Sequence, residues 1–105
     1  MVRYIKNMDE FKTVLETSKT KLVVVDFTAS WCGPCKFIGP FFDNLATENP
    51  EVEFVKVDVD DADDVAAACS IQAMPTFHFY KGGEKVDEMM GADQGKLTQL
   101  VAKNK

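Results

Sequence analysis

The spacing of apolar residues along the chain changes repeatedly between a strand pattern and a helix pattern. Apolar or β-branched runs at 22–27, 52–59 and 77–80 are typical of strands buried within a sheet. Apolar residues three and four positions apart indicate helices with one buried face. In chain order the predicted elements are a short strand at 2–6, a helix from 7 to about 17, a strand at 22–27, a helix from about 35 to 49, a strand at 52–59, a short helix ending at 69, strands at 77–80 and about 85–90, and a helix after 93.

Polar residues mark where the predicted helices begin. Asn7 followed by Glu10 has the spacing of a helix cap with a reciprocal acid. Asp61 is predicted to cap the short helix that ends at Cys69, and Asp93 to cap the C-terminal helix. Each cap would accept a hydrogen bond from a backbone N–H that the first helical turn leaves unpaired.

The long helix that ends near Asn49 is predicted to bury a wide apolar stripe. Pro40 lies inside this helix, where it cannot donate to the carbonyl of Lys36 and should kink the axis. Asn49-Pro50 ends the helix, because the residue before a proline disfavours helical geometry. The residues assigned to the stripe are Phe37, Ile38, Phe41, Phe42, Leu45 and Ala46.

This order of elements places the chain in the α/β class. Strands and helices alternate up to Cys69, and a hairpin and a helix follow, which predicts a mixed five-stranded sheet flanked by four helices. We expect the first three strands to be parallel and the hairpin strands antiparallel, with Gly82-Gly83 in the hairpin turn. A length of 105 residues is typical of one domain, so 1–105 is predicted to be a single domain.

Composition and charge narrow the class further. With 46% hydrophobic and 28% charged residues, the chain has the composition of a soluble globular protein. A net charge of -5 argues against nucleic-acid binding, and no apolar run approaches the ~20 residues of a membrane span. Residues 1–21 lack the apolar core of a secretory signal, and an odd number of cysteines favours a reducing compartment. We therefore expect a cytoplasmic protein with no nucleic-acid or membrane partner.

The stretch from Trp31 to Cys35 contains a Cys-x-x-Cys pair where an apolar strand gives way to a helix. If the helix begins near Cys32, unpaired N–H groups and the helix dipole stabilise a thiolate there, which is the nucleophilic form of cysteine. Pro34 suits the first helical turn, and Gly33 should leave the sulfur of Cys32 uncovered. The pair is therefore a candidate for making and breaking a disulfide.

Two other interpretations of the cysteine pair have to be weighed against redox chemistry. A structural disulfide closing so short a loop would contribute only about 2 kcal/mol. Structural zinc is the stronger rival, but it requires four ligands, and Cys69 and His78 lack the spacing of a second pair. Cys69 is better interpreted as a small buried hydrophobe, and His78 as a packed residue of its strand.

Asp26 is the one charged residue in the apolar run 22–27. It could lie at the end of its strand and face water. It could instead be a buried acid behind the cysteine pair, six residues before Cys32, where burial would raise its pKa and make it a proton carrier near neutral pH. Lys56, on the next predicted inner strand, could approach it from a neighbouring strand.

Four segments, combined along nearly the whole chain, carry a resemblance to a known family. They are Lys21–Phe27, Trp31–Lys36, Val57–Asp61 and Met74–Phe77. In these segments the chain resembles the thioredoxin family, and it is most similar to the animal cytosolic members. The resemblance implies the thioredoxin fold and a thiol-disulfide oxidoreductase that reduces protein disulfides.

The resemblance also implies roles for individual residues. Cys32 would attack the substrate disulfide and Cys35 would resolve the mixed disulfide, with a buried Asp26 assisting proton transfer. Pro75 would be preceded by a cis peptide bond and face the disulfide. The docking surface would consist of Trp31, Gly33, Pro34, Met74, Pro75, Gly91 and Ala92.

Partners follow from the same resemblance. We expect re-reduction by an NADPH-dependent flavoprotein thioredoxin reductase, and disulfide-containing substrates such as peroxiredoxins or ribonucleotide reductase. The chain would act as a monomer and need neither a cofactor nor a metal of its own. It departs from the animal members at Ala62 and Ala73, where those proteins often carry extra cysteines.

Two rival functions remain open. A disulfide oxidase or isomerase would need a more oxidising pair and an export signal, and Gly33-Pro34 between the cysteines speaks against it. A binding module that holds its partner only when reduced is compatible with every feature of the sequence.

Overall fold

The structure, a computed structural model, describes residues 2–105. The chain forms nine elements along these residues, and their order confirms the predicted one. They are β1 (Arg3–Tyr4), α1 (Met8–Thr17), β2 (Val23–Thr28), α2 (Gly33–Glu48), β3 (Glu53–Asp58), α3 (Asp63–Ala68), β4 (Thr76–Lys81), β5 (Glu84–Met90) and α4 (Gln94–Asn104).

The strands form one mixed sheet in the order β1-β3-β2-β4-β5. β1, β3 and β2 are parallel, whereas β4 is antiparallel to β2 and β5 is antiparallel to β4, as predicted. Gly82 and Gly83 join β4 to β5 with φ angles of 69° and 85°, the left-handed geometry that a two-residue hairpin turn favours. This topology places β2 at the centre of the sheet.

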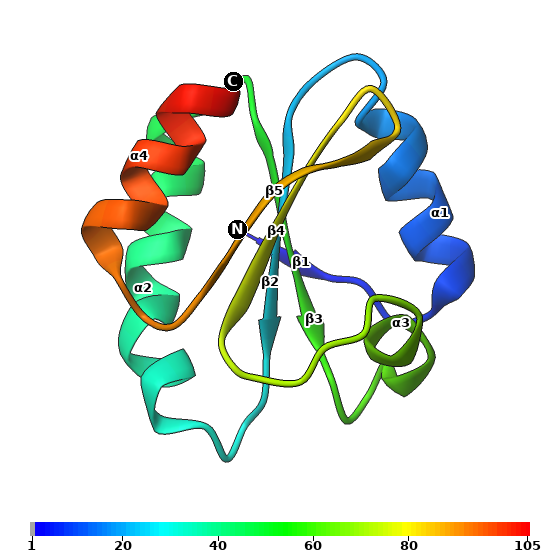
Figure 1. Ribbon diagram of the computed structural model, residues 1–105, viewed down its shortest axis with the longest axis vertical. Helices are drawn as coiled ribbons and strands as arrows, with labels where there is room; N and C mark the ends of the chain where they lie inside the picture. The colour runs from blue at the N-terminus through cyan, green and yellow to red at the C-terminus, as the bar shows by residue number, and fades with distance from the viewer. Residues whose placement is uncertain (1) are drawn as a thin grey trace.

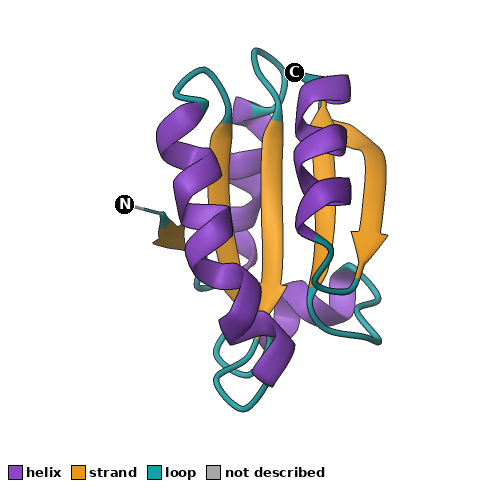
Figure 2. Ribbon diagram, turned by 90° about the vertical axis from the view of Figure 1, so that its left-hand side faces the viewer, coloured by secondary structure: helices purple, strands orange, loops and turns teal. Residues whose placement is uncertain are grey.

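Two helices cover each face of the sheet. α2 and α4 lie over one face, and α1 and α3 over the other (Figures 1 and 2). Because side chains alternate along a strand, Val24 of β2 packs into the cluster beneath α2 and α4, and Val23 and Val25 pack into the opposite one. The sequence of β2 is almost uniformly apolar because both of its faces are buried.

Side-chain caps begin three of the four helices within residues 2–105. Asn7 Oδ1 accepts from the N–H of Glu10, and Asp93 Oδ1 accepts from the N–H of Lys96, as predicted. The prediction for Asp61 is wrong, since Ala62 occupies the cap position of α3 and makes no side-chain cap hydrogen bond. Asp58 instead accepts from the N–H groups of Asp60 and Asp61, so the turn before α3 is closed from the end of β3.

The buried stripe of α2 is narrower than predicted. Ile38, Phe42 and Leu45 are buried together with Cys35, and Phe41 and Ala46 are half-buried. Phe37 is 64% exposed, so its assignment to the stripe is wrong. Its neighbour Ile38, which was also assigned to the stripe, is fully buried. Pro40 lies inside α2, and the kink expected there stays a prediction.

Ser18 joins the end of α1 to the β4–β5 turn. Its side chain is fully buried, and its hydroxyl donates to Leu15 O at 2.6 Å and accepts from the N–H of Gly83 at 3.0 Å. Its carbonyl also accepts from the N–H of Gly82 at 2.7 Å. One buried serine therefore holds two segments together that lie far apart in sequence.

Replacing Ser18 by Ala should destabilise the fold, because the part-buried N–H of Gly83 loses its acceptor. We expect a loss of about 1–3 kcal/mol in the free energy of unfolding, measured by urea denaturation. Thr13→Ala is the matched control, since Thr13 makes one exposed hydrogen bond to Asp9 O, and it should change stability by less than about 0.5 kcal/mol. Equal losses in the two variants would contradict this role for Ser18.

Candidate functional site

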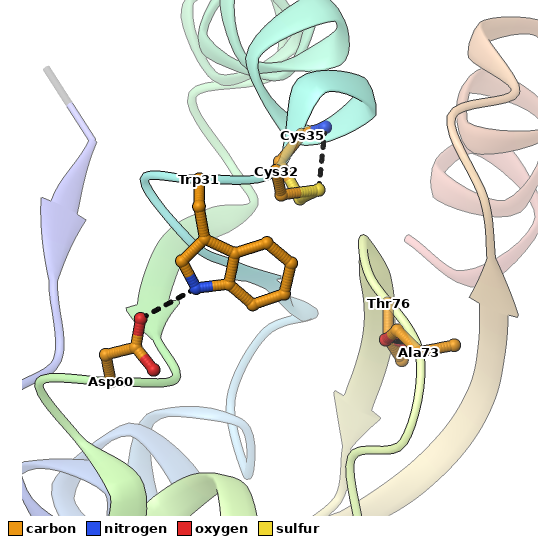
Figure 3. The surroundings of a disulfide bond; sticks show 6 residues. All are labelled: Trp31, Cys32, Cys35, Asp60, Ala73 and Thr76. Atoms are coloured by element: carbon orange, nitrogen blue, oxygen red, sulfur yellow. Dashed lines mark hydrogen bonds between the residues drawn. A yellow bond between two sulfur atoms is a disulfide. The ribbon is translucent and has the colours of Figure 1, made fainter.

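The cysteine pair lies beyond the carboxyl end of β2, at the start of α2. Cys32 and Cys35 are joined by a disulfide, and their Cα atoms are 5.3 Å apart, within the usual range for such a bond. Ala29 lies beneath the pair in a small buried cluster, and Met74 packs against that cluster from the segment before β4. Figure 3 shows this segment facing the disulfide across the site.

The local geometry favours negative charge on Cys32. Cys32 is the N-cap residue of α2, and its Sγ accepts from the N–H of Cys35 at 3.2 Å. The first turn of α2 contains no acidic residue, so no nearby negative charge offsets the positive end of the helix dipole at Cys32. The prediction of a helix beginning near Cys32 is therefore confirmed.

Access to the sulfur differs from the prediction. In this oxidised state Cys32 is 5% exposed and Cys35 is 2% exposed, so the sulfur of Cys32 is more covered than Gly33 led us to expect. The space beside Gly33 is open, because a side chain placed there would meet no atom within 4 Å among residues 2–105. A substrate therefore has room to approach on the Gly33 side.

Asp26 is buried, which rules out the water-facing interpretation. The residue is 1% exposed, and its Oδ1 has no hydrogen-bond partner among residues 2–105. Desolvation raises the pKa of Asp26 to about 7, with Lys56 opposing the shift and Asp43 adding to it. A cleft of about 350 Å³ contains Asp26, Cys35, Lys56 and Asp43 among its lining residues. The arrangement places a buried carboxyl with a raised pKa in the same cleft as the second cysteine.

Trp31 lies beside the disulfide and is 67% exposed. Its indole Nε1 donates to Asp60 Oδ2 at 2.9 Å, a contact that Figure 3 shows. Asp60 has no role in the site predicted from the sequence, because no local pattern links residues so far apart in the chain. The hydrogen bond fixes a large exposed aromatic ring next to the cysteine pair.

The segment before β4 supplies the other side of the site. The Met74–Pro75 peptide bond is cis, as the family resemblance predicted. Thr76 Oγ1 donates to Ala73 O at 2.6 Å, and the N–H of Gly91 donates to Pro75 O at 2.9 Å. Thus Gly91, at the end of β5, is tied to the same segment.

The predicted docking residues differ in how they lie. Gly33, Pro34 and Gly91 are exposed, Met74 is half-buried, and Pro75 is buried. Ala92 is half-buried and packs against the apolar cluster under α2 and α4. Sequence reasoning missed Met90, which is 60% exposed and pairs with Thr76 in the sheet. A strand-end methionine in a charged strand gives no clear signal of exposure.

Cys69 and His78 lie together on the α1/α3 side, where both contact the Tyr80 hydroxyl. His78 Nδ1 is 3.1 Å from Tyr80 Oη, and Cys69 Sγ is 3.7 Å from it. Burial lowers the pKa of His78 to about 4, which fits the predicted packed residue. Cys69 is half-buried, and burial raises its pKa, so it is less enclosed than predicted but not an activated thiol.

Metal-binding clusters and membrane-spanning helices are both absent from residues 2–105. No group of three or more His, Cys, Asp and Glu side chains in this part of the chain is arranged to hold a metal ion. No helix there combines the length and apolarity needed to cross a membrane.

Comparisons with known proteins agree with this geometry. The thioredoxin family model matches residues 2–103. Thioredoxin from Ictalurus punctatus is 51% identical over the full length of both chains, and thioredoxin from Equus caballus is 53% identical over 96% of each. The solved structure of Fasciola hepatica thioredoxin superposes with a TM-score of 0.96 at 44% identity, covering 99% of this chain and all of that one.

The match therefore includes the segments that build the site as well as the fold. The cysteine pair at the start of α2 is the redox-active pair of such proteins. The chain belongs to the thioredoxin family and is a thiol-disulfide oxidoreductase.

Proposed function

We propose that this disulfide reductase passes electrons from an NADPH-dependent thioredoxin reductase to disulfides of protein substrates. The observation that carries the proposal is the Cys32–Cys35 pair at the N-terminus of α2, with Cys32 Sγ accepting from the N–H of Cys35. A thiolate at this position keeps that hydrogen bond and faces the positive end of the helix dipole.

The reaction proceeds through two exchanges. Cys32 thiolate attacks one sulfur of the substrate disulfide, forming a mixed disulfide and releasing one substrate thiolate. Cys35 then loses its proton and attacks Cys32 Sγ, which forms the Cys32–Cys35 disulfide and releases the second substrate thiolate. The substrate gains two electrons, and the dithiol loses two. The reductase returns them from NADPH.

Asp26 takes the proton of Cys35 in the second exchange and returns one when the pair is reduced. Its burial and its raised pKa support this role, since a group with a pKa of about 7 can both accept and donate near neutral pH. The cleft that Asp26 and Cys35 share supports proton movement between them.

Substrates dock on the surface formed by Trp31, Gly33, Pro34, Met74, Pro75, Gly91 and Ala92. The exposed Trp31 ring and the open space at Gly33 support this assignment. An extended substrate segment pairs its backbone with Met74 in β fashion. The protein acts in the cytoplasm as a monomeric single domain, on substrates such as peroxiredoxins or ribonucleotide reductase.

The two cysteines should fail in different ways when replaced by serine. Cys32→Ser should be inert, because it lacks the attacking sulfur. Cys35→Ser should accumulate disulfide-linked complexes with target proteins through Cys32, because the second exchange is blocked. Non-reducing gels of each variant, with turnover of a protein disulfide by NADPH and thioredoxin reductase, test both expectations. Complexes trapped by Cys32→Ser alone would reverse the assigned roles, and wild-type protein that the reductase cannot reduce would refute the partnership.

Asp26→Ala should make the protein more stable but slower. Because the folded pKa of Asp26 is raised to about 7 from about 3.9 in an unfolded chain, its stabilising effect is complete at low pH and is lost as pH rises to about 7. Above pH 7, the buried Asp26 carboxylate lowers the free energy of unfolding by a penalty of the order of 4 kcal/mol. Asp26→Ala removes this penalty, but the packing lost with the side chain offsets part of the gain in stability.

Urea melts at pH 7.5 and pH 4 separate these effects. The Asp26→Ala midpoint should exceed that of the parent at pH 7.5, with little or no gain at pH 4, and reductase-coupled turnover should fall without being abolished. Asp61→Ala, which removes an exposed acid, should change neither quantity appreciably. Lower stability at pH 7.5, or unchanged turnover, would contradict the proton-carrying role.

Oxidation should leave Cys69 outside the disulfide chemistry. Its thiol has a raised pKa, and Ala62 and Ala73 offer no sulfur to pair with it. Mild peroxide should therefore give one intramolecular disulfide, Cys32–Cys35, and no major disulfide-linked dimer on non-reducing gels and by mass spectrometry. A dominant dimer that disappears in Cys69→Ser would show that Cys69 is a regulatory thiol.

A further inference from the structure

Lys56 is the cation nearest in the sheet to the buried Asp26. Lys56 of β3 and Asp26 of β2 are register partners in parallel strands, so their side chains leave the same face of the sheet. The Lys56 side chain is only 13% exposed. A mostly buried ammonium beside a mostly buried carboxyl would ordinarily form an ion pair.

The structure shows a different pairing. Lys56 Nζ lies 3.1 Å from Asp43 Oδ1, a carboxylate on α2 whose side chain is 51% exposed. The ammonium also lies 5.9 Å from the centre of the Tyr4 ring on β1. Asp26 Oδ1, in contrast, has no hydrogen-bond partner among residues 2–105. Two groups from outside β2 therefore hold the cation that could neutralise Asp26.

We propose that Asp43 is a positioning residue for the redox reaction: it binds Lys56, which lines the same cleft, so that Asp26 faces the cleft without a cationic partner. The inference rests on the proton-carrying role proposed for Asp26. It adds a reason why that carboxyl keeps its proton beside a lysine.

The charges around Asp26 act in opposite directions. Lys56 lowers the pKa of Asp26, and Asp43 raises it. From β4 the register partner of Asp26 is the apolar Phe77, which adds no charge. The remaining titratable side chains that line the cleft are Tyr4 on β1, Cys35 and Lys36 on α2, and Asp58 on β3. If Lys56 moved toward Asp26, its positive charge would lower the pKa of Asp26 further.

The position of Lys56 bears directly on the second exchange. A carboxylate paired with an ammonium binds its proton less tightly, so it is a weaker base toward the thiol of Cys35. Asp43 keeps the basicity of Asp26 matched to neutral pH without touching either sulfur. Its effect should therefore appear in the pH dependence of the reaction, which a merely structural role would leave unchanged.

Four variants test this inference. Asp43→Asn keeps the shape of the side chain but releases Lys56, and Lys56→Gln removes the cation. The double variant Asp43→Asn/Lys56→Gln separates an effect through Lys56 from a direct effect of the Asp43 charge. Glu48→Gln is the matched control, since it removes the same charge from α2, and Glu48 does not line this cleft.

The first measurement is the pKa of Asp26 from NMR titration of its carboxyl carbon in the oxidised protein. We expect Asp43→Asn to lower this pKa by about one unit, because an approaching opposite charge has effects of this size. Lys56→Gln should raise the pKa, and Glu48→Gln should match the parent. In the Lys56→Gln background, Asp43→Asn should lower the pKa by much less than it does in the parent, because only the direct charge of Asp43 is then lost. An unchanged pKa in Asp43→Asn, or an equal fall in the Lys56→Gln background, would overturn the inference.

The second measurement is the pH dependence of reductase-coupled turnover. Its acid limb should move to lower pH in Asp43→Asn, by the same amount as the NMR pKa. If the NMR pKa falls and the turnover profile does not move, Asp43 positions Lys56 as inferred, and the proton-carrying role proposed for Asp26 fails. If neither moves, the positioning role itself is refuted.

Discussion

The burial of β2 on both of its faces is the constraint on which the rest of the structure depends. Two layers of helices can cover a sheet only if its inner strands present apolar side chains to each layer. Val23 and Val25 pack on the side of α1 and α3, and Val24 packs on the side of α2 and α4. Asp26 occupies the next position in this alternation, so the same packing that forms the core takes its carboxyl out of water.

The site arises where segments remote in sequence meet beyond one end of that strand. The chain leaves β2 through Ala29 and Trp31 and enters α2 at Cys32, while the Met74–Pro75 segment returns into β4 alongside. Hydrogen bonds fix both parts, from Trp31 to Asp60 and from Gly91 to Pro75. The redox pair thus lies between the exposed ring of Trp31 and the segment that precedes β4.

The sequence predicted those features that depend on local periodicity or on short motifs. The order of strands and helices, the caps at Asn7 and Asp93, and the start of α2 at Cys32 all follow from residues within one turn of each other. The cis bond before Pro75 was predictable only through the family resemblance, because most X-Pro bonds in folded proteins are trans.

The errors have a common origin in tertiary geometry. Phe37 has helical spacing suited to burial, but the rotation of α2 on the sheet turns it outward. Asp61 has the right residue type for a cap, but Asp58 accepts the hydrogen bonds that close this turn, and Ala62 occupies the cap position of α3. The pairing of Lys56 with Asp43 depends on how α2 crosses β3, which neither segment encodes by itself.

The sulfur of Cys32 has two duties, because it is both the redox atom and the acceptor that caps α2. Each change of the partner of this sulfur during exchange therefore takes place at a helix terminus. The charge on Cys32 Sγ then interacts with the backbone N–H groups of the first turn of α2. This also makes substitutions at the position unequal. Serine retains a good capping group, whereas alanine removes the cap. A serine variant can thus separate loss of chemistry from loss of helix structure, but an alanine variant combines the two.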